Sequence, residues 1–320
     1  MAPAGFAKAR AQDWPQFEQN VANWHATMMA HGGQAFALYF EDSLQFAAAL
    51  FGAWHAQKRV VLSADATANT RARLSQCVDA LVGDWPDGLR ACAQSAIPQW
   101  QDLDRSGEQL VLYTSGSTGE PQQIPKRLEQ LFNEVEALQE CFGGRAGDAC
   151  VAGTVSHQHI YGLLFRVLWP LSTGRPIVSE RLAYAEDAAA LLRDREQSLI
   201  LIASPAHLAR LPSLQLGAVE QARLRLVFSS GGPLPAQALP DCLRELGQAP
   251  VEIYGSSETG GAAWRQCLPS SAVSDQWRML PGVQVRVSDE ILEISSNRLY
   301  DEGWFRSSDR VRLVELGFEL

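Results

Sequence analysis

The sequence predicts an α/β protein of doubly wound parallel sheets packed with helices, followed by a smaller antiparallel region that is similar to a β-barrel. Short apolar runs alternate with amphipathic stretches between residues 35 and 256, which is typical of parallel strands joined by helices. Beyond residue 262 the apolar segments become short and alternating, as in antiparallel sheets. Because 320 residues exceed what one hydrophobic core usually serves, we expect an α/β part at 1–261 and a β-rich part at 262–320.

The N-terminal third predicts regular elements but carries no recognisable chemistry. Asp42 or Ser43 can cap an alanine-rich helix, because a short polar side chain accepts hydrogen bonds from the first amides of a helix. Gly32 and Gly33 are typical of a helix end. The expected order is helix 6–31, strand 35–40, helix 43–54, strand 59–63, an amphipathic helix at 69–82 and an irregular stretch at 85–108.

The composition is that of a globular enzyme and argues against several other classes. Hydrophobic residues make up 46% of the chain and charged residues 20%. The net charge of −9 argues against a nucleic-acid partner, which needs a basic face. The six cysteines lack metal-binding spacing, and the longest apolar run, at 46–54, is too short to span a membrane. We expect a reduced cytoplasmic protein without a signal peptide.

The stretch from Leu110 to Pro121 is an apolar strand that runs into a loop of hydroxyls and glycines. Glycines let the backbone bend so that successive N–H groups point into one concavity, which suits phosphate oxygens. A Walker loop is excluded because no Gly-Lys-Ser or Gly-Lys-Thr follows, and a plain surface linker is the alternative. The candidate phosphate-binding residues are Thr114, Ser115, Gly116, Ser117, Thr118 and Gly119.

The residues after this loop predict a helix and then a strand with two histidines at its end. Pro125 is expected to open a helix reaching to about residue 142, with Lys126 either solvated or facing phosphate. A strand at 150–155 leads to His157 and His159, which alternate and could share a metal ion. No third ligand is evident nearby, so a buried core histidine or a substrate contact are the other interpretations of His159.

Further strands are expected to end in small and polar residues. In doubly wound sheets, ligands bind beyond the carboxyl ends of the strands. The residues at these ends are Ser204, the run from Ser229 to Pro233, and the run from Tyr254 to Glu258. The remaining expected elements are helices at 160–172, 184–196 and 205–211, strands at 175–179, 199–203 and 224–228, and a strand that begins at 251 and ends in a loop.

Five segments, in this order along residues 109–317, resemble the adenylate-forming (ANL) superfamily. The hydroxyl-rich loop is similar to its phosphate loop, and 159–163 to the His-x-x-Gly stretch of its acyl-CoA and aryl-CoA synthetases. Ser-Gly-Gly-Pro-Leu at 230–234, Tyr-Gly-Ser-Ser-Glu at 254–258 and Gly303 to Asp309 resemble its adenine, magnesium and ribose segments. The resemblance implies the N-terminal core of an acyl-CoA synthetase, an aryl-CoA synthetase or an acyl-carrier-protein ligase.

The resemblance also implies a role for each matching residue. The loop at 114–119 would hold the β- and γ-phosphates of ATP, Ser257 would reach the α-phosphate, and Glu258 would hold Mg²⁺. The implied catalytic residues are Thr118, His159 and Glu258. The implied nucleotide contacts further along the chain are Gly231, Gly232, Pro233 and Tyr254 at adenine, Gly255 and Ser257 near the phosphates, and Asp309 at ribose.

The acyl site implied by the resemblance lies around the histidine. His159 would lie beside the reacting carboxylate, and Tyr161 would line the acyl pocket, which favours an aryl acid such as a hydroxybenzoate over a fatty acid. Ser204, Ser229 and Gly255 are further candidates for substrate contacts. The thiol acceptor would be CoA or the phosphopantetheine arm of an acyl carrier protein.

The sequence departs from the family's pattern at several positions. Gln122 stands where a lysine is common, and Ser307-Ser308 stands where Thr-Gly is usual. The family's C-terminal domain, which carries a catalytic lysine, has no counterpart here. We expect a fragment whose partner is its own C-terminal domain, and a natural stand-alone core is the alternative. Two other functions stay open: a non-catalytic nucleotide-binding module, and a serine hydrolase, although the chain has no Gly-x-Ser-x-Gly elbow.

Overall fold

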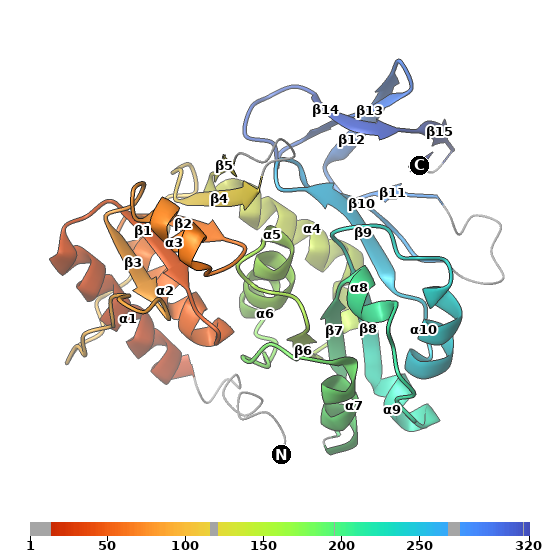
Figure 1. Ribbon diagram of the computed structural model, residues 1–320, viewed down its shortest axis with the longest axis horizontal. Helices are drawn as coiled ribbons and strands as arrows, with labels where there is room; N and C mark the ends of the chain where they lie inside the picture. Colours follow the sequence, from red (N-terminus) through yellow and green to blue (C-terminus); the bar gives the residue numbers. More distant parts are fainter. Residues whose placement is uncertain (1–13, 116–120, 195, 268–275, 316) are drawn as a thin grey trace.

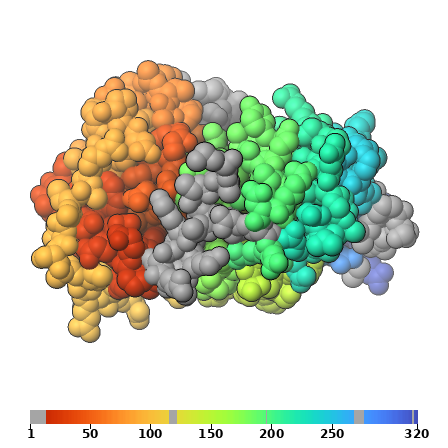
Figure 2. Space-filling model, turned by 90° about the horizontal axis from the view of Figure 1, so that it is seen from below, coloured from red at the N-terminus to blue at the C-terminus, as the bar shows by residue number. Residues whose placement is uncertain are grey.

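A computed structural model gives the fold, and it describes residues 14–115, 121–194, 196–267, 276–315 and 317–320. Two sheets dominate, of five and six strands, with helices between and outside them (Figure 1). Along the described chain, the first sheet region, in red to yellow, lies at one end of the molecule, and the cyan and blue C-terminal part lies at the other (Figure 2). This arrangement confirms the predicted α/β class.

The first sheet has the strand order β3-β1-β2-β4-β5, in which only β5 is antiparallel to its neighbour. Its side chains alternate between two cores, as a strand requires. In β1, for example, Phe36 and Leu38 face the main core, whereas Ala37 faces a smaller cluster on the other side. The strands are β1 Ala35–Tyr39, β2 Arg59–Ser63, β3 Ala80–Gly83, β4 Leu110–Ser115 and β5 Pro121–Lys126.

The second sheet has the order β11-β10-β9-β8-β7-β6. Strands β6 to β9 are parallel, and β10 is antiparallel to both β9 and β11. Ile200 and Ile202 face the main core that this sheet shares with the first, and Leu201 faces a separate outer core. The strands are β6 Cys150–Gly153, β7 Leu199–Ala203, β8 Leu224–Ser229, β9 Val251–Ser256, β10 Gly260–Arg265 and β11 Arg278–Met279.

Helices fill the space between the two sheets and cover their outer faces (Figure 1). The carboxylate of Asp42 caps α2 by accepting from the amides of Leu44 and Gln45, both at 2.9 Å, as predicted. The helices are α1 Trp14–His31, α2 Ser43–His55, α3 Ala68–Leu74, α4 Leu128–Ala146, α5 Ile160–Gly162, the π-helical η3 Leu163–Leu168, α6 Trp169–Ser172, α7 Ala185–Asp194, α8 Pro205–Leu208, α9 Ala218–Arg223 and α10 Ala238–Leu246.

The C-terminal part is antiparallel, as predicted, and packs around its own apolar cluster. A three-stranded sheet has the order β12-β13-β14, and β15 pairs with β16. The boundary expected after residue 261 falls inside β10, which pairs with β9 in the second large sheet. The strands are β12 Val283–Ser288, β13 Ile291–Ser296, β14 Phe305–Arg310, β15 Arg312–Val314 and β16 Gly317–Glu319.

Three local predictions were wrong. Pro125 does not open a helix: it lies in β5, and α4 begins at Leu128 with Arg127 as its N-cap. Proline is tolerated there because β5 is an edge strand, where a missing N–H costs little. The helix expected at 69–82 ends at Leu74, and residues 80–83 form strand β3, which pairs with β1. The segment 175–179 forms only a single bridge, at Ile177.

His157 is a buried histidine at the junction between the two large sheets. Its ring packs on Phe46 of α2, with centroids 4.7 Å apart, and only 2% of the residue is exposed. Burial and the charge of nearby Arg166 lower its pKa to about 3. His157 is therefore neutral in the folded protein across the physiological pH range.

This burial predicts a pH-dependent stability. The unfolded chain takes up a proton at His157 near pH 6.5, which the folded chain resists down to about pH 3. The stabilisation is therefore complete above pH 6.5 and is lost as the pH falls toward 3. We expect the loss of this stabilisation to lower the free energy of unfolding by roughly 2 kcal/mol between pH 7 and pH 4.5. The free energy of unfolding of His157→Leu, measured with urea at several pH values, should therefore fall less steeply with decreasing pH than that of the wild type. The same pH dependence in both proteins would contradict this role of His157.

Candidate functional site

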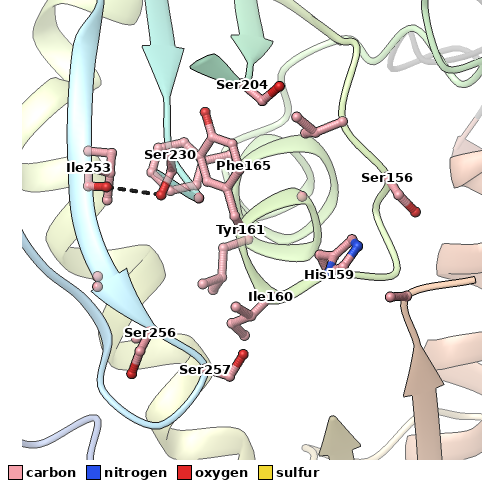
Figure 3. Close-up of a pocket in the computed structure, with 18 of the residues that line it drawn as sticks. Ser156, His159, Ile160, Tyr161, Phe165, Ser204, Ser230, Ile253, Ser256 and Ser257 are labelled. Carbon is pink, nitrogen blue, oxygen red and sulfur yellow. Dashed lines mark hydrogen bonds between the residues drawn. The ribbon is translucent and has the colours of Figure 1, made fainter. Parts of the chain in front are cut away.

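A cavity of about 480 Å³ lies beyond the carboxyl ends of the strands of the second sheet (Figure 3). Most of its lining comes from three parts of the chain: residues 154–165, the ends of β7 and β8, and the hairpin of β9 and β10. Ala64, Glu134 and Arg181 complete it. Figure 3 shows Ser156 and His159 on one side, Ser230 and Ile253 on the opposite side, and Tyr161 between them. The ends of β7, β8 and β9 thus border one concave site of the size that small ligands use.

His159 lies at the N-cap of α5, where the backbone is still extended. Desolvation by the surrounding walls lowers the pKa of its imidazole, and the carboxylate of Asp65 acts in the opposite direction. His157, two residues earlier, is buried and lines a separate cavity of about 250 Å³. The two histidines therefore occupy different environments, and among the described residues no group of three His, Cys, Asp or Glu side chains could hold a metal ion.

Tyr161 and Phe165 form an aromatic wall of the 480 Å³ cavity. Their ring centroids lie 4.9 Å apart, and Phe165 packs at the same distance on Phe228 of β8. Burial raises the pKa of the Tyr161 phenol well above its usual value. Gly162 is required between them, since a Cβ there would collide with the carbonyl oxygen of Ser156. This close contact gives a physical reason for the glycine three residues after His159.

The serines predicted for the acyl site lie at different depths. Ser204 lines the cavity, and its Oγ lies 2.8 Å from Nδ1 of His207. Ser229 is fully buried at the end of β8 and does not line the cavity, whereas the next residue, Ser230, does. The hydroxyl of Ser230 donates to the carbonyl oxygen of Ile253 at 2.9 Å and so links β8 to β9 (Figure 3).

The segment predicted to contact adenine is exposed at the rim of the site. Gly231, Gly232 and Pro233 are all exposed, and Gly231 lines the cavity. Gly231 has a φ of 88°, a conformation that side chains disfavour. The glycine is therefore needed for the backbone path here, because no atom lies close enough to exclude a Cβ.

Two predicted nucleotide residues, Tyr254 of β9 and Asp309 of β14, are in contact. Tyr254 donates its hydroxyl hydrogen to Asp309 Oδ2 at 2.5 Å, across 55 residues of sequence. Its ring packs against Trp277 and Phe318, with centroids 5.5 and 5.4 Å away. Burial and the Asp309 carboxylate raise the pKa of Tyr254. Gly255 also lines the 480 Å³ cavity.

Ser257 and Glu258 lie in the turn between β9 and β10 and face two different cavities. Ser257 lines the 480 Å³ cavity. Glu258 lines a second cavity of about 630 Å³, one wall of which is strand β5. The turn is braced by Thr259, whose Oγ1 accepts from the amide of Ser256 at 3.0 Å and whose amide donates to Ser256 Oγ at 3.2 Å.

The predicted phosphate loop lies mostly outside the described residues. Thr114 and Ser115 form the end of β4, and Pro121 begins β5 opposite Ser115. Gly116, Ser117, Thr118 and Gly119 fall in the undescribed gap. The two ends of the loop are nevertheless fixed as neighbours, because β4 and β5 form a hairpin next to the cavity that Glu258 lines.

Sequence reasoning missed several residues around these cavities. Arg181 borders both the 480 Å³ cavity and the 250 Å³ cavity, although it lies in an irregular stretch with no motif. His207 follows Ser204 by three residues, a spacing that could have indicated a contact within one helical turn. Lys126 was expected on a helix, but it is buried and reaches the backbone of Glu258. The signals for Arg181 and Lys126 are tertiary contacts that no local pattern carries.

Among the described residues, no helix is both long enough and apolar enough to cross a bilayer. All six cysteines lie in the described part of the chain, and no disulfide joins them.

The chain is similar in sequence to enzymes that attach acids to thiols. The chain is 34% identical over 162 residues to a 4-coumarate–CoA ligase of Rhodobacter capsulatus, covering 49% of the chain and 40% of that ligase. It is 26% identical over 234 residues to the 3,4-dihydroxybenzoate–[aryl-carrier protein] ligase of Bacillus anthracis, covering 71% of the chain and 53% of that ligase. The chain thus matches about half the length of these relatives.

The fold has solved counterparts as well. The crystal structure of ATP-bound MatB from Rhodopseudomonas palustris superposes with a TM-score of 0.75 at 18% identity, covering 96% of this chain and 72% of that chain. A family model described as AMP-binding enzyme matches residues 65–296, which is well over half of the sequence and includes four of the five predicted motifs. The chain therefore belongs to the family of AMP-binding enzymes.

Proposed function

We propose that this chain is the nucleotide- and acid-binding core of an enzyme that activates a carboxylic acid with ATP and passes the acyl group to a thiol. The observation that carries the proposal is the hydrogen bond between Tyr254 and Asp309. It brings the predicted adenine and ribose residues into contact, and the two sequence neighbours of Tyr254, Ile253 and Gly255, line the cavity that His159 and Tyr161 also line. One ATP molecule and one acid could therefore meet at this edge of the sheet.

The proposed reaction has two steps. An oxygen of the substrate carboxylate attacks the α-phosphorus of ATP, the bond from that phosphorus to the bridging oxygen breaks, and pyrophosphate leaves. The sulfur of a thiol then attacks the acyl carbonyl, loses its proton, and AMP leaves with the bonding electrons. The acceptor thiol would be that of CoA or of the phosphopantetheine arm of an acyl carrier protein.

The chain's own residues would bind and orient the two substrates. Tyr254 and the Gly231 to Pro233 segment would hold adenine, Asp309 would accept from the ribose hydroxyls, and the loop at 114–119 would cradle the phosphates. Because its pKa is lowered, His159 is neutral at physiological pH and can donate a hydrogen bond to the substrate carboxylate without forming an ion pair.

Glu258 fits a role as ligand to Mg²⁺. Its carboxylate makes no hydrogen bond or ion pair in the part of the chain that the structure describes, and it lines the cavity beside β5. Oxygen donors are what Mg²⁺ prefers, and one carboxylate with phosphate oxygens and waters is a common ligand set. When bound there, Mg²⁺ would offset the negative charge of the phosphates.

The aromatic wall favours an aryl acid as substrate. Tyr161 and Phe165 offer flat apolar faces, on which a ring packs with more contact than a single alkyl chain. The names of both relatives above contain aromatic acids, which supports the same class, with a fatty acid as the alternative. Because the chain spans about half of those relatives, the complete activity is proposed together with the family's C-terminal domain as partner. The six cysteines form no disulfide, which favours the reducing cytoplasm as the location of the protein.

The acid class is tested by comparing carboxylic acids. In acid-dependent ATP–pyrophosphate exchange with the C-terminal domain present, hydroxybenzoates and hydroxycinnamates should be activated more efficiently than alkyl acids of similar size. Tyr161→Ala should lower kcat/KM for the aryl acids by about tenfold, or roughly 1.4 kcal/mol, because it removes one wall. It should change the value for acetate little. Equal losses for aryl acids and acetate would contradict the aryl preference.

The role of Glu258 is tested by ATP binding to this chain with and without Mg²⁺. Glu258→Ala should reduce by about tenfold the gain in ATP affinity that Mg²⁺ provides, since the protein ligand is lost. Binding in EDTA should not change. Glu136→Ala is a matched control, because Glu136 is an exposed carboxylate on α4 that only approaches Arg105 at 3.8 Å. A normal Mg²⁺ response in Glu258→Ala would exclude this role.

The ribose contact is tested with deoxynucleotides. Asp309→Asn should bind ATP about tenfold more weakly and should no longer distinguish ATP from 3′-deoxy-ATP. Tyr254→Phe keeps the ring but loses the hydroxyl that holds Asp309, so it should cost only two- to threefold. Calorimetric titration measures both. Retained discrimination by Asp309→Asn would place the ribose elsewhere.

A further inference from the structure

Lys126 is a buried cation in a place that the proposed reaction does not explain. Only 2% of the residue is exposed, and burial lowers its pKa to about 8. An ammonium in such a position needs hydrogen-bond acceptors, because losing its water without replacement costs several kcal/mol. Its Nζ donates to the carbonyl oxygen of Glu258 at 2.7 Å and to that of Arg298 at 3.4 Å.

The position of Lys126 separates it from the phosphate loop. It pairs with Leu110, at the opposite end of the β4–β5 hairpin from Ser115 and Pro121. Five residues of extended strand span about 17 Å. Lys126 is therefore not a substitute for the lysine that the family commonly has at the position of Gln122. Its ammonium contacts the backbone of the turn that carries the proposed Mg²⁺ ligand.

The contact matters because, in the described part of the chain, it is a direct hydrogen bond between β5 and this turn, whereas Glu134 and Arg298 hold the start of β10 at Gly261. The bonds between Ser256 and Thr259 brace the turn internally, but they do not fix it relative to the first sheet. The carbonyl oxygen of Glu258 is anchored by Lys126, and the side chain of Glu258 extends from the same residue into the cavity walled by β5. Fixing the backbone of Glu258 thus limits where its carboxylate can lie.

The structure also provides a matched contact that does not touch the turn. Gln130, in the first turn of α4, donates to the same carbonyl oxygen of Arg298 at 2.6 Å and is as deeply buried as Lys126. No hydrogen bond is recorded between Gln130 and Glu258 in the described part of the chain. A change at Gln130 therefore perturbs the same interface without releasing the turn.

We propose that Lys126 is a positioning residue that sets the Mg²⁺ affinity of the nucleotide site by fixing the backbone of Glu258, without touching the nucleotide itself. The proposal rests on the function proposed above, since it takes Glu258 as the metal ligand. It assigns to Lys126 an effect on the metal requirement, separate from any effect on folding.

The experiment is a Mg²⁺ titration of ATP binding to the full 320-residue chain. For Lys126→Met, the Mg²⁺ concentration at half-maximal enhancement of binding should rise about tenfold, while ATP affinity in EDTA stays within twofold. For Gln130→Leu the Mg²⁺ midpoint should stay within twofold of the wild type, although its melting temperature falls. Equal shifts in the two variants, or no shift in Lys126→Met, would overturn the proposal.

A double variant tests whether Lys126 acts through Glu258. In a Glu258→Ala background, Lys126→Met should cause no further shift in the Mg²⁺ midpoint, and independent additive shifts would overturn the proposal. If Lys126→Met does not fold, Lys126→Arg serves instead, because it retains a buried cation with altered geometry. Lys126→Arg should raise the Mg²⁺ midpoint about threefold, and an unchanged midpoint would overturn the proposal.

These outcomes are distinct from failure of the proposed function. A wild-type chain that binds no ATP, with or without Mg²⁺, would overturn the proposed function together with this inference. Mg²⁺-dependent ATP binding that is indifferent to Lys126 would overturn the inference alone.

Discussion

The arrangement of the site depends on a group of buried charges where the three parts of the fold meet. Lys126, Glu134 and Arg298 are all at most 3% exposed, and they come from β5, α4 and the loop after β13. Glu134 accepts from the amide of Gly261 at 2.5 Å, and Arg298 donates to the carbonyl oxygen of the same residue at 2.7 Å. Removing one member of a buried charged group typically costs 3–5 kcal/mol, so the three parts are held in one arrangement.

The burial of these charges has opposite effects on the carboxylate and on the cations. Burial raises the pKa of Glu134, while Arg298, the Gly261 amide and Lys126 lower it. Burial lowers the pKa of Arg298 and of Lys126, and Glu134 raises both. Each ion is thus tolerable in the interior because the others are present. The same group fixes the start of β10, and with it the turn that carries Glu258.

The acyl side of the site is instead an extension of the hydrophobic core. Phe142 of α4 packs on Phe228 with centroids 5.0 Å apart, Phe228 packs on Phe165, and Phe165 packs on Tyr161 in the cavity wall. The rings form a continuous series from the space between the sheets to the substrate cavity. Packing in such an interior resists small displacements, so the cavity shape follows from the core.

Much of the fold and the site could be predicted because the relevant signals are local. Short apolar runs marked β1, β2, β4, β7, β8 and β9, and the motif at 254–258 marked a loop at the end of β9. What could not be predicted depends on tertiary contacts. Pro125 fits a helix start equally well until β4 provides its partner strand. Lys126 resembles a surface residue until the backbone of Glu258 lies beside it.

The two prolines of β5 have a consequence for the molecule as a whole. β5 is the outermost strand of its sheet, and an outer strand can recruit a strand from another molecule through its unpaired amides. Pro121 and Pro125 carry no amide hydrogen, so this border offers an incomplete template for intermolecular pairing. Pro125, which led to the wrong prediction of a helix, thus also makes this edge a poorer template for pairing with a strand of another molecule.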